Sequence, residues 1–144
     1  MNLAAIRSGP KRAAGVATAL FTVGGLLVLW SSYIHFHLWD AVGYRHIPTI
    51  GVLFLLQCIA GLVLAVSLVA VRKAWVAVIG AGFALSTLVG FVVSMERGLF
   101  GFMDSWSAPF ATQAFAIELA TIAVLSLAAG LCLVGPPAFE TTRR

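Results

Sequence analysis

The stretch TIGVLFLLQCIAGLVLAVSLVAV, residues 49–71, decides the fold. It contains no charged residue, and a helix of about 20 apolar residues is long enough to cross the hydrocarbon core of a bilayer. Backbone N–H and C=O groups find no water in lipid, so they must pair within the segment, which therefore has to be a helix. We predict a transmembrane helix over these residues.

Three further segments have the same length and character: residues 14–38, 74–95 and 110–134. Only Arg72 and Lys73 separate two of the spans, which therefore form an antiparallel hairpin. The sequence predicts an all-α fold, a left-handed four-helix transmembrane bundle with up-down-up-down topology. Tails at residues 1–13 and 135–144 flank this single domain, residues 14–134.

The composition agrees with a lipid-exposed protein. Hydrophobic residues make up 61% of the chain and charged residues 10%, whereas a soluble domain is typically about 45–50% apolar and about 25% charged. The net charge of +4 would favour nucleic-acid binding in a soluble protein. Here the basic residues flank the apolar segments, so we expect no nucleic-acid partner. The expected partner is the bilayer, and a membrane-protein partner or a second copy of the chain stays open.

The basic residues predict an orientation, because cytoplasmic connections carry an excess of lysine and arginine. Both tails and the short link hold most of them, while the other two connections hold one each. We therefore expect a multi-pass protein of the cell membrane with both termini in the cytoplasm. The residues expected on the cytoplasmic side are Arg7, Lys11, Arg12, Arg72, Lys73, Arg143 and Arg144, and those expected on the outer side are Arg45 and Arg97.

Two motifs are distinctive. GYRHIPTIGVLFLLQ spans residues 43–57, and GLFGF at residues 98–102 is followed by Glu118 in the next helix. The chain resembles small four-helix integral membrane proteins of actinobacterial type, for which no activity is known. The resemblance implies the bacterial inner membrane and the same architecture, and it implies no site. DoxX-like proteins share the four-helix layout, but their motif is not matched here.

Glu118 is the only acidic residue deep within a predicted span. A charge there costs at least about 2.5 kcal/mol, so we expect the carboxyl to face the bundle interior with a partner, or to be protonated. Gln57 lies at the same depth, about 12 Å below the outer boundary at a rise of 1.5 Å per residue. Either Ser31 or Ser32, together with Thr87, completes a predicted polar layer in the outer half, with one contribution from each helix.

Two interpretations of this layer stay open. Polar side chains commonly bond across membrane helices, at about 0.6 kcal/mol on average, and then act only as structural contacts. Alternatively, the layer binds a proton, a cation or a small ligand, with His35 as a further candidate residue. The loop at residues 98–102 either folds over the mouth of the bundle, enters the membrane or anchors at its surface.

The histidines suggest a metal site. His35, His37 and His46 all lie in the outer region, and imidazole suits zinc or copper. Residues two apart on a helix point to nearly opposite faces, so only one of His35 and His37 faces inward if the first helix continues through Leu38. No cofactor is expected, and haem is disfavoured because no histidine lies within the later spans.

The sequence shows no catalytic grouping and leaves the process unknown. We expect a small non-enzymatic accessory or interaction subunit, because a four-helix chain of this size should enclose little volume. An ion-, proton- or ligand-handling protein that uses Glu118 is the alternative, and a membrane enzyme acting on a lipid or a quinone is the third.

Overall fold

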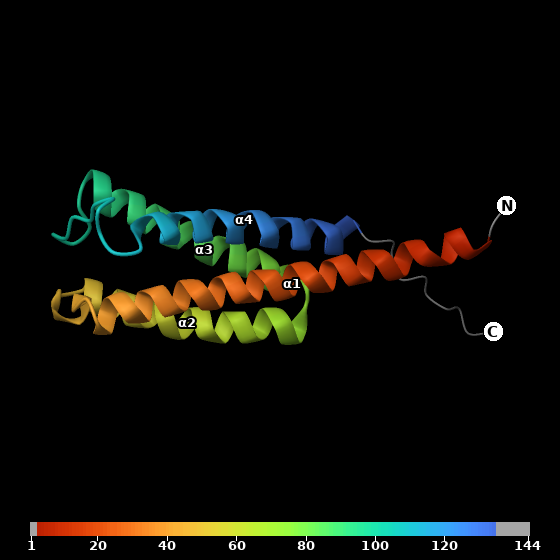
Figure 1. Cartoon of the computed structure of the whole chain (residues 1–144), viewed down its shortest axis with the longest axis horizontal. Coiled ribbons are helices and arrows are strands. Elements are labelled where there is room, and N and C mark those ends of the chain that lie inside the picture. The colour runs from red at the N-terminus through yellow and green to blue at the C-terminus, as the bar shows by residue number, and fades with distance from the viewer. Residues whose placement is uncertain (1–2, 135–144) are drawn as a thin grey trace.

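The computed structural model describes residues 3–134, with side chains from residue 14 onward. Within this part of the chain all regular structure is helical, and four helices dominate (Figure 1). They are α1 (Leu3–Asp40), α2 (Ile50–Val71), α3 (Ala74–Glu96) and α4 (Ala111–Val134), with a short 3-10 helix η1 (Tyr44–His46) between α1 and α2. The prediction of an all-α four-helix bundle is confirmed.

All four helices are long and apolar enough to cross a membrane. The candidate spans agree with the predicted ones to within two residues at each end, and the first of them is Ala14–Asp40. α1 itself begins earlier, at Leu3, so most of the predicted N-terminal tail continues the first helix. The predicted tail at residues 135–144 lies outside the described residues. The chain is a multi-pass membrane protein.

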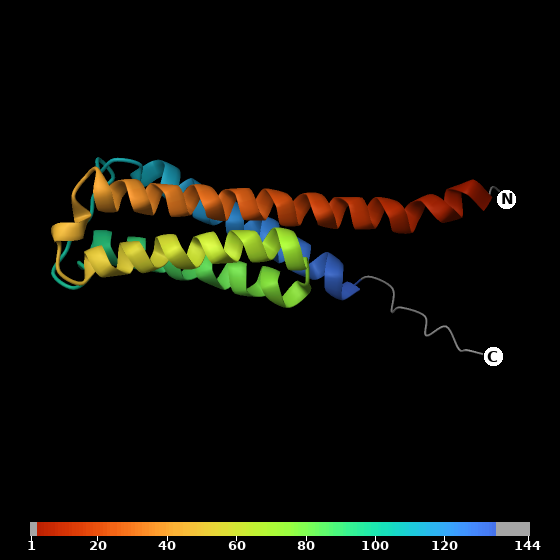
Figure 2. The ribbon, with the colours of Figure 1, turned by 90° about the horizontal axis from the view of Figure 1, so that it is seen from below.

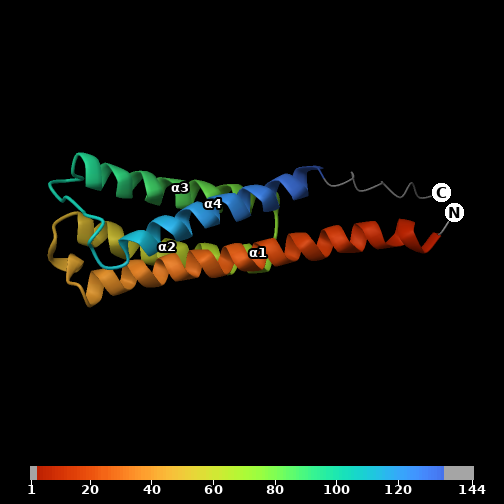
Figure 3. The same ribbon diagram turned by 45° about the horizontal axis from the view of Figure 1, so that its top comes forward.

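Successive helices run antiparallel, which gives the bundle two ends. We call the end that carries Arg72 and Lys73 the link end, and the opposite end, with residues 41–49 and 97–110, the loop end. α1 runs past the other helices at the link end (Figures 2 and 3). At the loop end, η1 and the long α3–α4 connection join the helices (Figures 1 and 2).

The helices associate as two pairs. α1 packs along α2, α3 packs along α4, and α1 also packs along α4, whereas α2 and α3 touch at few places. Figure 1 shows α2 and α3 diverging from their short link toward the loop end. The bundle is therefore closed at the link end and more open at the loop end.

The closed half holds the apolar core. Leu125 of α4 is fully buried at its centre. A Cβ atom on Gly24 of α1 would lie 2.3 Å from Leu125 Cδ2, and one on Gly80 of α3 would lie 2.5 Å from Leu125 Cδ1. Small residues let membrane helices approach closely, so these two glycines allow α1, α3 and α4 to close around Leu125.

The α3–α4 connection folds back over the loop end. The backbones of Leu99 and Phe102 bond to each other in both directions, at N···O distances of 2.7 and 2.9 Å. Phe100 and Gly101 between them have φ values of 50° and 81°, and positive φ at both central residues is typical of a type I′ turn. Leu99 and Phe102 border the cavity described below, which agrees with the first of the three alternatives, a loop that folds over the mouth of the bundle.

Candidate functional site

Two polar pairs join the helix pairs across the middle of the bundle. Ser31 Oγ of α1 donates a hydrogen bond to Glu118 Oε1 of α4, at 2.5 Å. Gln57 Nε2 of α2 donates to Thr87 Oγ1 of α3. Glu118 is 3% exposed and so does not point into lipid. The structure thus brings together the polar layer predicted from depth along each span.

The neighbouring serine has a different role. Ser32 is also buried, but its hydroxyl donates to Val28 O within α1, at 2.9 Å. A Cβ atom on Gly61 of α2 would collide with this hydroxyl, so Ser32 marks the close α1–α2 contact. The two alternatives left open by the sequence are therefore resolved in favour of Ser31, which faces Glu118.

His35 joins the same network from one turn further toward the loop end. Its Nδ1 lies 2.8 Å from Ser31 O, and because a carbonyl oxygen can only accept, Nδ1 must carry the proton. In neutral imidazole the other ring nitrogen is then an acceptor. Ser31 therefore organises both ionisable groups: its carbonyl oxygen holds His35, and its hydroxyl holds Glu118.

A cavity of about 290 Å³ lies between the polar layer and the loop end. Side chains of all four helices and of the α3–α4 connection border it, and most of them are apolar. Glu118, Gln57 and Thr87 border the cavity on the side away from the loop end. Ser31 does not border it but donates its hydrogen bond to Glu118, which does. The polar residues in its wall are His35, Gln57, Ser86, Thr87, Ser94, Asp104 and Glu118.

Aromatic rings form a second layer on the loop-end side of the polar layer. The rings of His35 and Phe54 lie 5.0 Å apart on the α1–α2 side. Those of Phe91 and Phe115 lie 6.4 Å apart on the α3–α4 side, and Trp106 packs edge-on against both. The cavity thus has a polar floor and a wall rich in aromatic rings.

Asp104 places a second carboxyl near the mouth of the cavity. Its backbone N–H donates to Ser94 O at 3.2 Å, which ties the connection to the end of α3. Burial raises the pKa of Asp104, and a hydrogen bond from the Ser105 N–H opposes that rise. Burial also raises the pKa of Tyr44, and the negative charge of Asp104 adds to this effect.

The three histidines do not form the predicted metal site. α1 continues to Asp40, so His35 is buried in the interior, while His37 packs edge-on against Phe110 at a ring distance of 5.2 Å. His46 is exposed beside Arg45, at an Nε2···Nε distance of 3.2 Å. Within the described part of the chain no three His, Cys, Asp or Glu residues are grouped to hold a metal ion.

Sequence reasoning missed the aromatic wall and the membership of Ser94 and Asp104 in the site, whereas Ser86 lies at the depth predicted for the polar layer. A signal was present, because residues three or four apart share a helix face. Three phenylalanines of the cavity wall each lie three or four positions from a residue of the polar layer, on the loop-end side of it. The pairs are Phe54 with Gln57, Phe91 with Thr87 and Phe115 with Glu118.

Comparison with protein-family models, with curated proteins and with solved structures gives no match to this chain. The resemblance to actinobacterial membrane proteins stays a prediction. The chemistry of the cavity therefore has to be inferred from its own residues.

Proposed function

We propose that this protein binds a small ligand, largely apolar but with one polar group, in the loop-end cavity. The observation that carries the proposal is the cavity of about 290 Å³ with Glu118 at its floor. Small-molecule sites are concave, mostly apolar and fitted with a few convergent polar groups, in volumes of about 300–1,000 Å³. The cavity, at about 290 Å³, lies just below the lower end of that range.

Glu118 is the strongest individual support. An ionisable residue inside a membrane is expensive to keep there and marks a functional site by default. A purely structural contact needs no free space beside it, yet Glu118 borders the cavity as well as bonding to Ser31. Gln57 and Thr87, which bond to each other, border the same space.

The accessory-subunit interpretation rested partly on the expectation that the chain encloses little volume, beside the lack of a catalytic grouping. That expectation is wrong for the loop-end half, because the cavity lies there. A partner subunit stays the second candidate. The large apolar side chains exposed along the helices, such as Val52, Val63 and Val66, are equally suited to lipid and to a partner helix.

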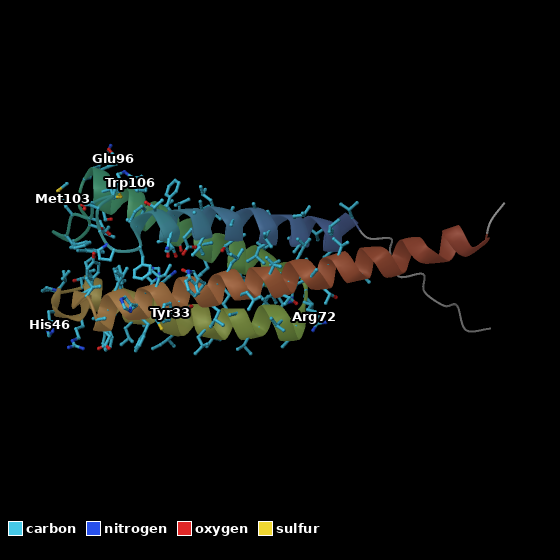
Figure 4. The ribbon with its side chains drawn as sticks, viewed as in Figure 1. Tyr33, His46, Arg72, Glu96, Met103 and Trp106 are labelled. Carbon is cyan, nitrogen blue, oxygen red and sulfur yellow. The ribbon has the colours of Figure 1, made fainter. Side chains whose placement is uncertain are left out.

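The proposed location is the cell membrane, with the loop end outside and both termini in the cytoplasm. Arg72 lies at the link end, opposite His46, Glu96, Met103 and Trp106 (Figure 4). The excess of basic residues flanking the link end supports this orientation. Fusing a fluorescent protein or alkaline phosphatase to the C-terminus tests it, and only the fluorescent fusion should be active.

Glycines on α3 allow a direct test of ligand binding. A Cβ atom at Gly90, which borders the cavity, meets no atom within 4 Å, and the same is true of Gly82, which does not border it. Gly90→Leu should therefore fill free space in the cavity, while Gly82→Leu is the matched control. The wild type and both variants are purified from native membranes in mild detergent and weighed by native mass spectrometry.

We expect a small-molecule adduct of one defined mass on the wild type and on Gly82→Leu, and its loss from Gly90→Leu. The same adduct on all three proteins would show that the molecule binds outside the cavity. A stoichiometric membrane-protein partner on all three, with no small molecule, would favour the accessory subunit instead.

A further inference from the structure

We infer that the ligand of this cavity is a protonated amine with an apolar body, seated with its ammonium group on Glu118 and its body against the aromatic wall. This inference rests on the proposed function and adds a chemical class to it. Three features of the cavity carry it: the sign of its charges, the direction of its hydrogen bonds and the rings in its wall.

The charges that border the cavity are acidic. Glu118 lies at the floor and Asp104 near the mouth, and no lysine or arginine is among the described residues of the wall. The one hydrogen-bond partner recorded for Glu118 is the neutral hydroxyl of Ser31. A carboxyl held in a membrane requires a proton or a cationic partner. Because the chain brings no cation to this wall, a cationic ligand can take that place.

The hydrogen bonds leave mainly acceptors facing the cavity. The hydroxyls of Ser86 and Thr87 both donate to Phe83 O, at 2.7 and 3.0 Å, and Ser94 donates to Phe91 O at 2.7 Å. The hydroxyl protons of these three residues therefore bond within α3, and the Ser31 hydroxyl proton bonds to Glu118, so none of them is left to donate to a ligand.

His35 adds a further acceptor, since its one ring proton is directed to Ser31 O. Of the polar groups in the wall, the Gln57 amide is the main donor, and one of its two N–H bonds goes to Thr87. A ligand that donates hydrogen bonds and carries positive charge complements this set. A ligand that only accepts, such as a quinone carbonyl, finds few partners.

The aromatic wall suits a cation as well. Cations are attracted to ring faces, by about 0.5–1 kcal/mol at exposed sites and about 2 kcal/mol when desolvated. Phe54, Phe91 and Phe115 border the cavity one turn above the polar floor. An organic cation therefore meets rings along its body and a carboxyl at its head.

An inorganic ion fits less well. Calcium takes six to eight oxygen ligands, and magnesium takes six in an octahedron. Most of the cavity wall is apolar, and the described residues hold no group of three His, Cys, Asp or Glu residues that could bind a metal. The site therefore favours one charge spread over an organic body.

We expect the ligand to enter from the bilayer on the side of the bundle between α2 and α3. Leu53 of α2 and Ser86 of α3 border the cavity and are also exposed on the outside of the bundle. An amine with an apolar body partitions into membranes, so it can enter the cavity directly from the lipid.

The test uses 2-phenylethylammonium as the probe and 2-phenylethanol as its neutral analogue, which keeps the ring and a hydrogen-bond donor. Saturation binding of the radiolabelled amine to the full chain in nonionic detergent gives the affinity. We expect the alcohol to compete at least about tenfold more weakly than the unlabelled amine, which corresponds to about 1.4 kcal/mol.

The variants are Glu118→Gln, Glu96→Gln and Gly90→Leu. Glu118→Gln should weaken amine binding at least about tenfold, since Gln can still accept the Ser31 bond but has no charge. Glu96, exposed and outside the cavity wall, is the matched control, and its variant should bind like the wild type. Gly90→Leu should abolish binding by filling the cavity.

Proton competition gives a second readout that does not depend on a variant. The titratable groups facing the cavity with Glu118 are His35 from α1 and Asp104 from the α3–α4 connection, and α2 and α3 contribute none. Protonating either carboxyl removes attraction and protonating His35 adds repulsion, so acid should weaken amine binding. The affinity should therefore fall as the pH is lowered, and Glu118→Gln should flatten that profile.

Three results would overturn the inference. Equal binding of amine and alcohol, blocked by Gly90→Leu, would show a neutral-ligand site and leave the proposed function intact. No binding of the amine to the wild type would exclude the proposed class. Amine binding that Gly90→Leu leaves unchanged would place the amine outside the cavity, and would count against both the class and the cavity as its site.

Discussion

The two halves of this bundle use the same four helices for different purposes. In the link-end half, glycine and alanine lie where the helices face one another, and the backbones close around Leu125. In the loop-end half, phenylalanine and polar residues face inward, α2 and α3 diverge, and a cavity remains. One membrane bundle can therefore be closely packed at one end and enclose a cavity at the other.

The contrast also separates two kinds of polar contact. Ser32, at the close α1–α2 contact, directs its hydroxyl to its own helix, as does Thr121 of α4. The Ser31 hydroxyl and the Gln57 amide instead donate to side chains of other helices, Glu118 and Thr87. These two bonds between helices lie in the polar layer, which is the boundary between the two halves.

The largest expected effect is in the solid half. Leu125→Ala should destabilise the fold by about 2–5 kcal/mol, because a buried leucine loses its contacts and leaves a void. Leu127, 55% exposed on the same helix, is the control, and its change to Ala should cost far less. Unfolding in mixed micelles, followed by tryptophan fluorescence, measures both. Similar small losses for the two variants would contradict a solid core at the link end.

The same substitution on one helix compares the halves directly. Gly80→Leu forces atoms onto Leu125 and should cost about 1–3 kcal/mol. Gly90→Leu enters free space and should change the free energy of unfolding by less than about 0.5 kcal/mol. Both are measured in the same micelle assay. A large decrease in the free energy of unfolding for Gly90→Leu would mean that the loop-end half is closely packed and holds no cavity.

Neighbouring serines test the boundary. Ser31→Ala removes the one recorded donor to Glu118 and leaves a buried carboxyl without it, which should cost about 1–2 kcal/mol. Ser32→Ala removes a bond within one helix and should cost less than about 0.5 kcal/mol. The two thermal unfolding curves should therefore separate clearly. Coincident curves would show that the Ser31–Glu118 bond adds no stability.

The spans and the polar layer could be predicted because each depends on length along the chain. An apolar run of about 20 residues sets a crossing, and a rise of 1.5 Å per residue sets the depth of Gln57 and Glu118. The choice between Ser31 and Ser32 could not be predicted in this way. It depends on the rotation of α1 about its axis, which packing against α2 and α4 determines.

The cavity was beyond prediction from one sequence for a related reason. Whether two helices meet or diverge depends on how their facing side chains fit together, and Phe54 and Phe91 were not recognised as facing the same space. The structure does not bring the three histidines together, because α1 stays helical to Asp40 and residues two apart on a helix point to nearly opposite faces. The sequence predicts this outcome if the first helix continues through Leu38, but it could not establish where that helix ends.

A smaller effect is expected for the bond between α2 and α3. A double-mutant cycle of Gln57→Leu and Thr87→Val should give a coupling energy of about 0.6 kcal/mol, the average for such bonds in membranes. Unfolding of the wild type, both single variants and the double variant supplies the four values. A coupling near zero would mean that this bond does not hold the two helices together.

The smallest effect is a dependence on pH at the mouth. Since burial raises the pKa of Asp104 in the folded chain, the charged carboxyl lowers stability above that pKa. This loss disappears below the ordinary aspartate pKa, about 3.9. Asp104→Asn should therefore be slightly more stable than the wild type at neutral pH, and this advantage should vanish below about pH 4. Thermal unfolding at several pH values tests it, and an advantage that grows in acid would contradict the account.

The most direct test of a cavity that reaches Glu118 is its reaction with a hydrophobic carbodiimide. Dicyclohexylcarbodiimide modifies protonated carboxyls that it can reach from the membrane, and peptide mass spectrometry locates the adduct. The account predicts an adduct on Glu118 in the wild type and in Gly82→Leu, and its loss in Gly90→Leu. An unreactive Glu118 in the wild type, or equal labelling in both glycine variants, would contradict a cavity at the loop end.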